Sequence, residues 1–273
     1  MKDLIKDYFT DNIYRGKYFS AEYFYQSMFR KVSFKDKSGK INTGNWERDG
    51  IVYRDKIYDP ADVEILPPTT PTKIICVGRN YLKHAEEMDN ELPEKPLLFI
   101  KTPNCVAGHE DTIQLLEGKE RMDYEAELAV IIGERCKNVS REDALYFVEG
   151  YSCFIDVTNR DDQKWEKNWV RAKAFDNSAP VGPVIVPCGS VSDDARIQCR
   201  LNDVVKQDST IDNMYFSVPE LIEEITKYMT LERGDIIATG TPEGVGQLHD
   251  GDTVEVEIDG IGTLRNYFVE PSK

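Results

Sequence analysis

Residues 124–133 read Tyr-Glu-Ala-Glu-Leu-Ala-Val-Ile-Ile-Gly, a stretch that places two carboxylates two positions apart in an apolar run. Successive side chains of a β-strand point to opposite faces, so Glu125 and Glu127 share one face, roughly 7 Å apart, and repel each other where the dielectric constant is low. If the strand is buried, the pair needs a cation. If the strand lies at a sheet edge, both acids can face water, and these residues alone leave that alternative open.

A third carboxylate, Asp156, ends a second apolar run at residues 151–156. Three hard oxygen ligands suit Mg²⁺, Mn²⁺ or Ca²⁺. The cysteines are not spaced for zinc, because no Cys-x-x-Cys pair occurs among the six, which are Cys76, Cys105, Cys136, Cys153, Cys188 and Cys199. In a chain of this length their scatter predicts reduced thiols that behave as small apolar residues.

Further motifs surround these acids in a fixed order. They are Val77-Gly78-Arg79-Asn80-Tyr81-Leu82-Lys83-His84-Ala85-Glu86-Glu87-Met88, Asp156-Val157-Thr158-Asn159-Arg160-Asp161-Asp162-Gln163, Lys173-Ala174-Phe175-Asp176, Pro180-Val181-Gly182-Pro183 and Gly234-Asp235-Ile236-Ile237-Ala238-Thr239-Gly240-Thr241-Pro242-Glu243-Gly244-Val245-Gly246. With Glu125-x-Glu127 they resemble the fumarylacetoacetate hydrolase family over residues 72 to 268. The resemblance implies that Glu125, Glu127 and Asp156 bind a divalent metal ion, Mg²⁺ or Mn²⁺, with Ca²⁺ as a further candidate.

Many short strand-like runs and few helical ones predict a β-rich α+β fold. Residues 67–71 read Pro-Pro-Thr-Thr-Pro, which can sustain neither a helix nor a paired strand, so we place a domain boundary there. Residues 1–70 then form a small N-terminal domain and residues 71–273 the catalytic domain. The family resemblance implies that the catalytic domain is a mixed β-roll and that two copies of the chain form a homodimer.

Two helix starts and two turns can be located in the sequence. Ser140 and Ser217 each precede a helical pattern, and the second has a capping box with Glu220. The apolar face of that second helix is expected to contain Leu221, Ile222, Ile225, Tyr228 and Met229. Residues 200–205 predict a tight hairpin, and residues 252–259 alternate like a strand before a turn at Gly260.

The net charge of −15 argues against nucleic acid and anionic membranes as partners. The substrate that the resemblance implies is a small anionic 2-oxo acid, so local positive charge must overcome the overall field. Arg79, Lys101 and Lys173 are candidates for that role. No apolar run is long enough to span a membrane, and residues 1–7 lack the features of a secretory signal, which predicts a cytoplasmic protein.

His84 and Glu87 lie three positions apart in a segment of good helix formers, so both would project from one helical face. A histidine supplies a base near neutral pH, and a carboxylate can orient it for the activation of water. The alternative is an exposed helix with a weak surface pair. The resemblance implies the first reading, with this segment acting as a mobile lid.

The remaining candidate groups come from the family resemblance. Lys173, close to two tryptophans and Phe175, would be a catalytic residue that holds a carboxylate or carbonyl oxygen. Substrate-binding roles are implied for Arg79, Tyr81, Gln163 and Thr241. His109 and His249 occur in glycine-containing turn regions and are expected to be turn or surface residues.

The resemblance implies a reaction in which a 2,4-diketo acid is held by the metal and a carbon–carbon bond is cleaved. The Gly78-Arg79-Asn80-Tyr81 form of the motif most resembles that of acylpyruvate-cleaving members of the family, and this resemblance implies hydrolysis of an acylpyruvate, with His84 and Glu87 activating water. The alternatives are a keto–enol isomerase or a decarboxylase of an oxaloacetate-like 2-oxo dicarboxylic acid, because both need the same enolate. A metal-binding protein without catalytic activity is a further alternative.

Overall fold

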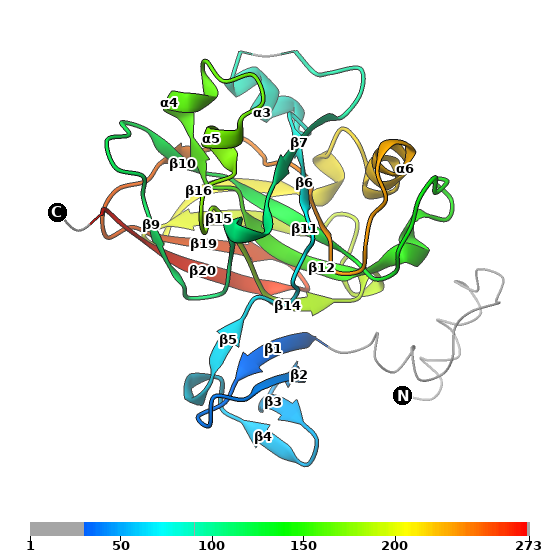
Figure 1. Ribbon diagram of the computed structural model, residues 1–273, viewed down its shortest axis with the longest axis vertical. Helices are drawn as coiled ribbons and strands as arrows, with labels where there is room; N and C mark the ends of the chain where they lie inside the picture. The colour runs from blue at the N-terminus through cyan, green and yellow to red at the C-terminus, as the bar shows by residue number, and fades with distance from the viewer. Residues whose placement is uncertain (1–29, 90, 272–273) are drawn as a thin grey trace.

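The computed structural model describes residues 30–89 and 91–271, and it is built mainly of β-strands (Figure 1). A twelve-stranded sheet runs through this part of the chain in the order β4-β3-β2-β1-β14-β12-β11-β17-β6-β7, with β5 paired to β1 and β8 paired to β14. Its strands are β1 (Lys31–Lys35), β2 (Ile41–Glu47), β3 (Gly50–Tyr53), β4 (Lys56–Tyr58), β5 (Glu64–Leu66), β6 (Ile74–Gly78), β7 (Leu97–Lys101), β8 (Val106–Ala107), β11 (Ala126–Ile132), β12 (Val148–Ile155), β14 (Ala179–Val186) and β17 (Ile236–Ala238).

Two smaller sheets complete the described β-structure. The five-stranded sheet has the order β16-β15-β19-β20-β9, with β9 (Thr112–Gln114), β15 (Arg196–Leu201), β16 (Val204–Thr210), β19 (Thr253–Ile258) and β20 (Gly262–Val269). The three-stranded sheet contains β13 (Thr158–Asn159), β10 (Met122–Tyr124) and β18 (Gly246–Gln247). The β-rich α+β class predicted from the sequence is confirmed.

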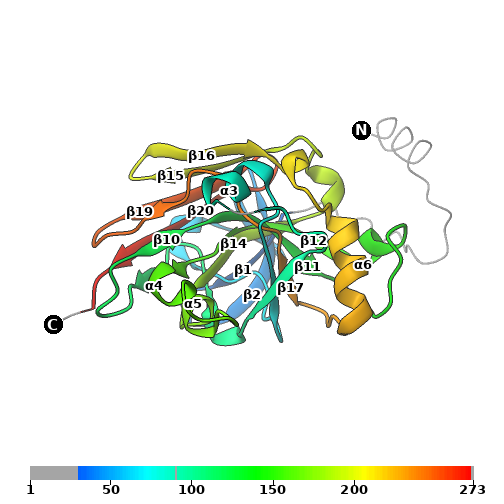
Figure 2. The same ribbon diagram turned by 90° about the horizontal axis from the view of Figure 1, so that it is seen from above.

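Helices are short and few in the described residues. They are α3 (Leu82–Glu87), α4 (Arg160–Gln163), α5 (Val170–Lys173) and α6 (Val218–Tyr228), together with 3₁₀ turns at Pro60–Asp62, Pro103–Cys105, Ala144–Phe147, Cys188–Ser190 and Ile211–Asn213. Figure 2 shows α6 on one side of the strands and α4 with α5 on the other. Within the described ranges no helix has the length and apolar character needed to cross a membrane.

Strand β11 is buried on both faces, which explains its continuous apolar sequence. Its even-numbered residues, from Ala126 to Ile132, join a core that includes the inner face of the five-stranded sheet. Its odd-numbered residues, Ala129 and Ile131, pack with residues of β6, β12 and β14. The strand pairs antiparallel with β12 and β17, so it is a central strand and not an edge. The alternative of two acids on a solvated edge strand is therefore wrong.

The structure confirms three local predictions: helix α6, the hairpin at residues 200–205 and the turn at Gly260. In each, the residues that form the cap or turn are close together in the chain. Helix α6 has the capping box of Ser217 and Glu220, although Tyr228, expected on its apolar face, is exposed. Strands β15 and β16 form the expected hairpin, with Asn202 and Asp203 both at positive φ, as a type I′ turn requires. The turn at Gly260, with φ of +83°, joins β19 to β20.

The helix predicted to begin at Ser140 is wrong. Ser140 instead forms a local turn, in which its hydroxyl donates to Asp143 Oδ2 at 2.9 Å, and only the 3₁₀ turn Ala144–Phe147 follows. The cause is strand pairing: Val148 must enter β12 opposite Ile132 of β11, so the chain has no room to continue a helix. A capping signal does not reveal how soon the next strand must start.

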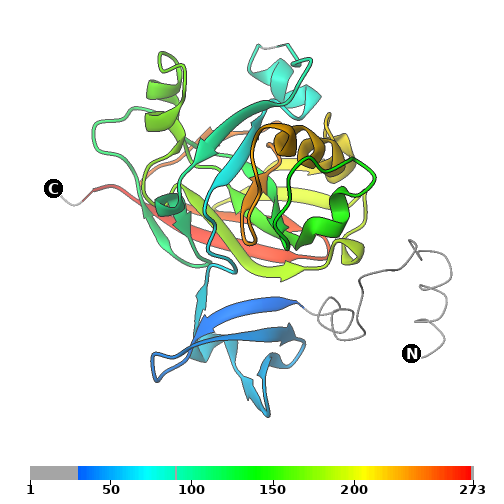
Figure 3. The same ribbon diagram turned by 45° about the vertical axis from the view of Figure 1, so that its right-hand side comes forward.

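The described part of the predicted N-terminal domain forms a separate lobe. Figures 1 and 3 show β1–β5 at the end of the molecule opposite α3, α4 and α5. The lobe joins the main body where Lys31 of β1 pairs with Ile185 of β14. The chain that follows is held in place, because the Thr72 amide and hydroxyl donate to Asp235 Oδ1 at 2.9 and 2.7 Å. The boundary at residue 70 stays a prediction, and residues 1–29 lie outside the described part.

We expect a truncated chain of residues 71–273 to fold and to bind Mn²⁺ as the full chain does, because every residue that lines the pocket described below lies between residues 77 and 241. Its melting temperature should fall, since β14 loses its pairing with β1. Circular dichroism and calorimetric Mn²⁺ titration of both chains would check this. A folded truncated chain without Mn²⁺ affinity would show that the N-terminal residues contribute to the site.

Candidate metal centre and catalytic pocket

Three carboxylates meet where β11 begins and β12 ends. Glu125 directly precedes β11, Glu127 is its second residue, and Asp156 directly follows β12. The pairing of Ala126 with Ile155 brings these segments side by side, and the Asp156 amide donates to the Glu125 carbonyl at 2.8 Å. One oxygen of each carboxylate lies within 4.8 Å of the others, and all three residues are buried. The cluster predicted from the sequence is thus present in the structure.

The three acids differ in electrostatic compensation. Burial alone would raise the pKa of Glu125, but Lys173 Nζ at 2.7 Å and Arg160 Nη2 at 2.6 Å lower that pKa below its ordinary value. Burial raises the pKa of Glu127 well above its ordinary value, and the charges of Asp156 and Glu125 raise it further. The charge of Lys173 and the Gly240 amide at 2.8 Å lower the pKa of Glu127, but by less than burial and the two acids raise it. Glu127 is the acid of this cluster that most needs a cation.

The arrangement fits a divalent metal ion. Asp156 Oδ1 is buried and accepts no well-aligned hydrogen bond in the described structure, although Lys101 Nζ lies 2.9 Å away. That oxygen therefore keeps a lone pair for a ligand. Together with Glu127 and Glu125 it offers three hard, anionic oxygens, which is the donor set that Mg²⁺ and Mn²⁺ favour. The cluster could hold one such ion.

A chain of alternating charges connects the cluster to the rim of the pocket. It runs through Arg121, Asp123, Arg160, Glu125, Lys173, Asp156 and Lys101. Arg160 bridges two acids of this chain, because its Nε donates to Asp123 at 2.8 Å and its Nη2 donates to Glu125. Each acid in the chain has two cationic neighbours, so its negative charge is compensated although it is buried.

Sequence reasoning missed Arg160, Asp123 and Arg121 as parts of the site. The signal for Arg160 was weak but present, because it begins α4 directly after the helix cap Asn159, whose side chain accepts from two backbone amides. A charged residue next to a metal-ligand motif in an otherwise buried segment needs a partner. No local pattern, however, identifies Asp123 as that partner, because the two residues are 37 positions apart.

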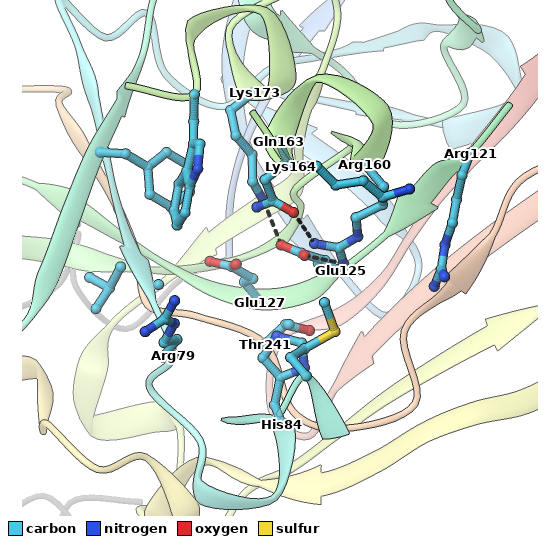
Figure 4. A pocket seen from close by; sticks show the side chains of 15 residues that line it. Arg79, His84, Arg121, Glu125, Glu127, Arg160, Gln163, Lys164, Lys173 and Thr241 are labelled. Carbon is cyan, nitrogen blue, oxygen red and sulfur yellow. Dashed lines mark hydrogen bonds and ion pairs between the residues drawn. The ribbon is translucent and has the colours of Figure 1, made fainter. Parts of the chain in front are cut away.

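A pocket of about 350 Å³ opens above Glu125 and Glu127. Its remaining wall contains basic and polar side chains at Arg79, His84, Arg121, Arg160, Gln163, Lys164, Lys173 and Thr241, and apolar groups at Val77, Gly78, Met88, Phe99 and Trp169. Figure 4 shows Lys173, Gln163 and Arg160 on one side of this cavity and His84 with Thr241 on the other. The structure thus gathers most of the predicted site residues around one cavity.

His84 and Glu87 form the expected pair on helix α3. His84 Nδ1 lies 3.2 Å from Glu87 Oε2, and His84 is buried against the pocket. The Gly244 amide also donates to the Glu87 carboxylate, at 3.1 and 3.2 Å. Lys83 forms an ion pair with Glu243 at 3.3 Å, so α3 is fastened to the loop that contains Thr241. Glu87 itself does not line the cavity and can act only through His84.

Tyr81 and the two other histidines lie outside the cavity wall. Tyr81 directly precedes α3 and is buried, with its hydroxyl unpaired among the described residues, and its pKa is raised by burial and by Glu127. The expected substrate contact of Tyr81 is therefore not part of this arrangement. His109 accepts from the Arg265 amide in a second hollow beside β20, and His249 is exposed in a turn before β19.

Comparisons with known proteins show the family to which the chain belongs. Residues 73–269 match the family model described as the fumarylacetoacetate hydrolase C-terminal domain. The chain is 43% identical over 224 residues to oxaloacetate tautomerase YisK of Bacillus subtilis, covering 77% of this chain and 74% of that protein. It is 47% identical over 237 residues to an uncharacterized protein of Archaeoglobus fulgidus, covering 85% and 94% of the two chains.

A solved structure is also similar. The crystal structure of 2-hydroxyhepta-2,4-diene-1,7-dioate isomerase from Mycobacterium marinum superimposes with a TM-score of 0.82 at 33% identity, over 90% of this chain and all of that one. The chain belongs to the fumarylacetoacetate hydrolase family. The expected family and its fold are therefore confirmed.

We expect Glu127→Gln to weaken Mn²⁺ binding by about two orders of magnitude, because it removes the one ligand charge that has no cationic partner at 4 Å or less among the described residues. The metal-free variant should also melt at a higher temperature than the parent, since a buried repulsion is lost. Calorimetry and thermal unfolding measure the two effects. Glu134→Gln, an exposed acid, is the matched control, and equal Mn²⁺ affinity in both variants would contradict the assignment.

Metal affinity should rise with pH. The raised pKa of Glu127 means that a proton must leave before the carboxylate binds a cation, so the Kd should fall by up to about tenfold per pH unit below that pKa. In the metal-free protein the same raised pKa makes Glu127 increasingly destabilising as the pH rises above the ordinary carboxyl range. Titration in buffers of different ionisation enthalpy would reveal the released proton. A pH-independent Kd would show that Glu127 is already ionised.

Proposed function

We propose that the protein is a metal-dependent tautomerase that interconverts the enol and keto forms of a dicarboxylic 2-oxo acid such as oxaloacetate. The observation that carries this proposal is the charge of the pocket wall. It contains five basic side chains, Arg79, Arg121, Arg160, Lys164 and Lys173, but two carboxylates, Glu125 and Glu127, among the described residues. Three of the five are paired with buried acids, so the excess positive charge comes from Arg79 and Lys164. In a chain of net charge −15, this local excess attracts a ligand with more than one negative charge.

A dicarboxylate matches that charge better than a monocarboxylate does. A bound divalent cation would stabilise negative charge on the 2-oxo oxygen as a Lewis acid. With such a cation present, the wall has a still larger positive excess, so a second substrate carboxylate adds attraction. The candidates for binding that distal carboxylate are two exposed cations of the wall: Lys164, and Arg121, which is also paired with Asp123.

His84 is our candidate for the group that moves the proton. Tautomerisation removes a proton from the enol oxygen and adds one at C3, and the reverse reaction does the opposite. With Nδ1 donating to Glu87, the His84 Nε2 can accept or donate a proton at C3. Lys173 holds its ammonium charge because Asp156 and Glu125 raise its pKa despite burial. Its three hydrogens are donated to Glu125, Asp156 and Thr158, so it would act on an anionic substrate through its charge.

The names of relatives support the same class of reaction. Besides YisK, a Xenopus laevis protein named mitochondrial oxaloacetate tautomerase fahd2 is 39% identical over 222 residues, covering 77% of this chain and 70% of that protein. The similar crystal structure from Mycobacterium marinum is named an isomerase. These names agree with the keto–enol alternative at least as well as with hydrolysis.

Hydrolysis of an acylpyruvate is the second candidate. It is favoured by the His84–Glu87 pair, since an imidazole oriented by a carboxylate can also activate water. Decarboxylation of the same oxo acid uses the same enolate and is the third candidate. The three reactions differ in product, so one set of assays separates them.

The experiment is to supply oxaloacetate in its enol form with Mg²⁺ or Mn²⁺ and to follow the loss of enol absorbance, with carbon dioxide release measured in parallel. Acylpyruvates with neutral acyl groups are then assayed for cleavage. Accelerated ketonisation without cleavage or carbon dioxide supports the proposal. Cleavage of acylpyruvates at rates above those of ketonisation would favour the hydrolase instead.

We predict that His84→Ala lowers kcat for ketonisation by about two to four orders of magnitude, the usual contribution of general acid–base catalysis. The Kd of oxalate with bound Mn²⁺ should change little, because the imidazole is needed for proton transfer and not for holding a carboxylate. His249→Ala, an exposed histidine, is the matched control. Parent-like rates in both His84→Ala and Glu87→Ala would exclude this pair as the proton carrier.

A further inference from the structure

Gln207 links two parts of the site from a distant strand. It lies in β16, the edge strand of the five-stranded sheet, and is the one fully buried residue of that strand. Its Oε1 accepts from the Ala126 amide at 3.0 Å, and its Nε2 donates to Thr241 Oγ1 and to the Pro242 carbonyl, both at 2.8 Å. All hydrogen-bonding groups of this amide are thereby used.

The orientation of this amide is set by its backbone partners. The Ala126 N–H can only donate and the Pro242 carbonyl can only accept, so Oε1 must face Ala126 and Nε2 must face Pro242. A flipped amide would leave two buried backbone groups unpaired. The side chain therefore has one arrangement, and Nε2 presents a hydrogen to Thr241.

This arrangement decides what the Thr241 hydroxyl can do. Because Oγ1 accepts from Gln207, the hydroxyl hydrogen must point away from Gln207. Thr241 lines the cavity, so that hydrogen is available to an anionic ligand there. Gln207 Oε1 accepts from the amide of Ala126, the residue between Glu125 and Glu127. Gln207 therefore also holds the backbone that positions these two acids.

Strand β16 also sets the loop that continues from Thr241. A Cβ atom at Gly244 would lie 2.0 Å from the Lys206 carbonyl, so this loop packs directly on β16 and needs a glycine there. The amide of that glycine is the donor to Glu87. The edge strand thus supports both the hydroxyl at Thr241 and the carboxylate that orients His84.

We propose that Gln207 is a positioning residue that makes the Thr241 hydroxyl a hydrogen-bond donor to a carboxylate or 2-oxo oxygen of the substrate. An apolar side chain of similar size at position 207 would fill the same space, but the Pro242 carbonyl would lose the hydrogen bond from Gln207. The Thr241 hydroxyl could then rotate and donate to that carbonyl. The inference rests on the proposed function only in taking the ligand to be an oxo acid or dicarboxylate.

The test is a double-mutant cycle with oxalate as the probe, measured calorimetrically on the full chain with saturating Mn²⁺. Gln207→Leu should weaken oxalate binding by about ten- to a hundredfold, the worth of a hydrogen bond to a charged group. Thr241→Val should weaken it to a similar degree. In the Thr241→Val background, Gln207→Leu should add less than about threefold, because both changes remove the same interaction.

Gln207→Glu is a second variant that keeps the size and the acceptor for Ala126 but reverses the polarity facing Thr241. It should also weaken oxalate binding, and it stays informative if Gln207→Leu does not fold. Gln198→Leu, in the neighbouring strand β15, changes a similarly buried glutamine that contacts Arg200 and not the pocket, and it should bind oxalate as the parent does. Mn²⁺ affinity measured alone identifies any effect that acts through the acids.

Additive losses in the cycle, or a folded Gln207→Glu protein with parent-like oxalate affinity, would overturn the proposal. So would a parent protein that binds Mn²⁺ but not oxalate. These outcomes are independent of the reaction, because oxalate is not turned over. A parent that binds oxalate with the expected coupling but does not ketonise oxaloacetate would sink the tautomerase proposal and leave the role of Gln207 intact.

Discussion

Burial of three carboxylates within 4.8 Å of one another is the constraint on which the site depends. Such a cluster is unstable unless positive charge surrounds it, and the chain supplies that charge in a graded way. Glu125 has two cationic partners and Asp156 has Lys173 together with the nearby Lys101. Glu127 has one backbone amide. The remaining imbalance at Glu127 would contribute binding energy for a divalent cation.

The same constraint explains why the pocket is positive in an acidic protein. The cations that compensate the buried acids reach the cavity wall, and Arg79 and Lys164 add charges that do not form ion pairs with those acids. The net charge of −15 is that of the whole chain. An anionic ligand would be attracted to this cavity, where its own charge and that of a bound cation would complete the balance.

The groups for proton transfer are held by parts of the fold that are distant in sequence. Helix α3 supplies His84 and Glu87, and the loop after β17 supplies the Gly244 amide that holds Glu87. That loop rests on β16, and the buried amide of Gln207 connects it to the peptide between the two acids. The proposed metal ligands, substrate donor and proton carrier thus share a single framework of hydrogen bonds.

The sequence by itself determined the family, the β-rich class, helix α6, the β15–β16 hairpin and the identity of the three acids. Each depends on residues close together in the chain, or on motifs whose order is visible without a structure. Only the tertiary structure decided that β11 is central, that Arg160 pairs with Asp123, and that Gln207 faces Thr241. It also replaced the helix predicted at Ser140 with a short turn. The physical reason is the same in all these cases: strand register selects which distant side chains meet, and register is a property of the packed sheets and not of any one segment.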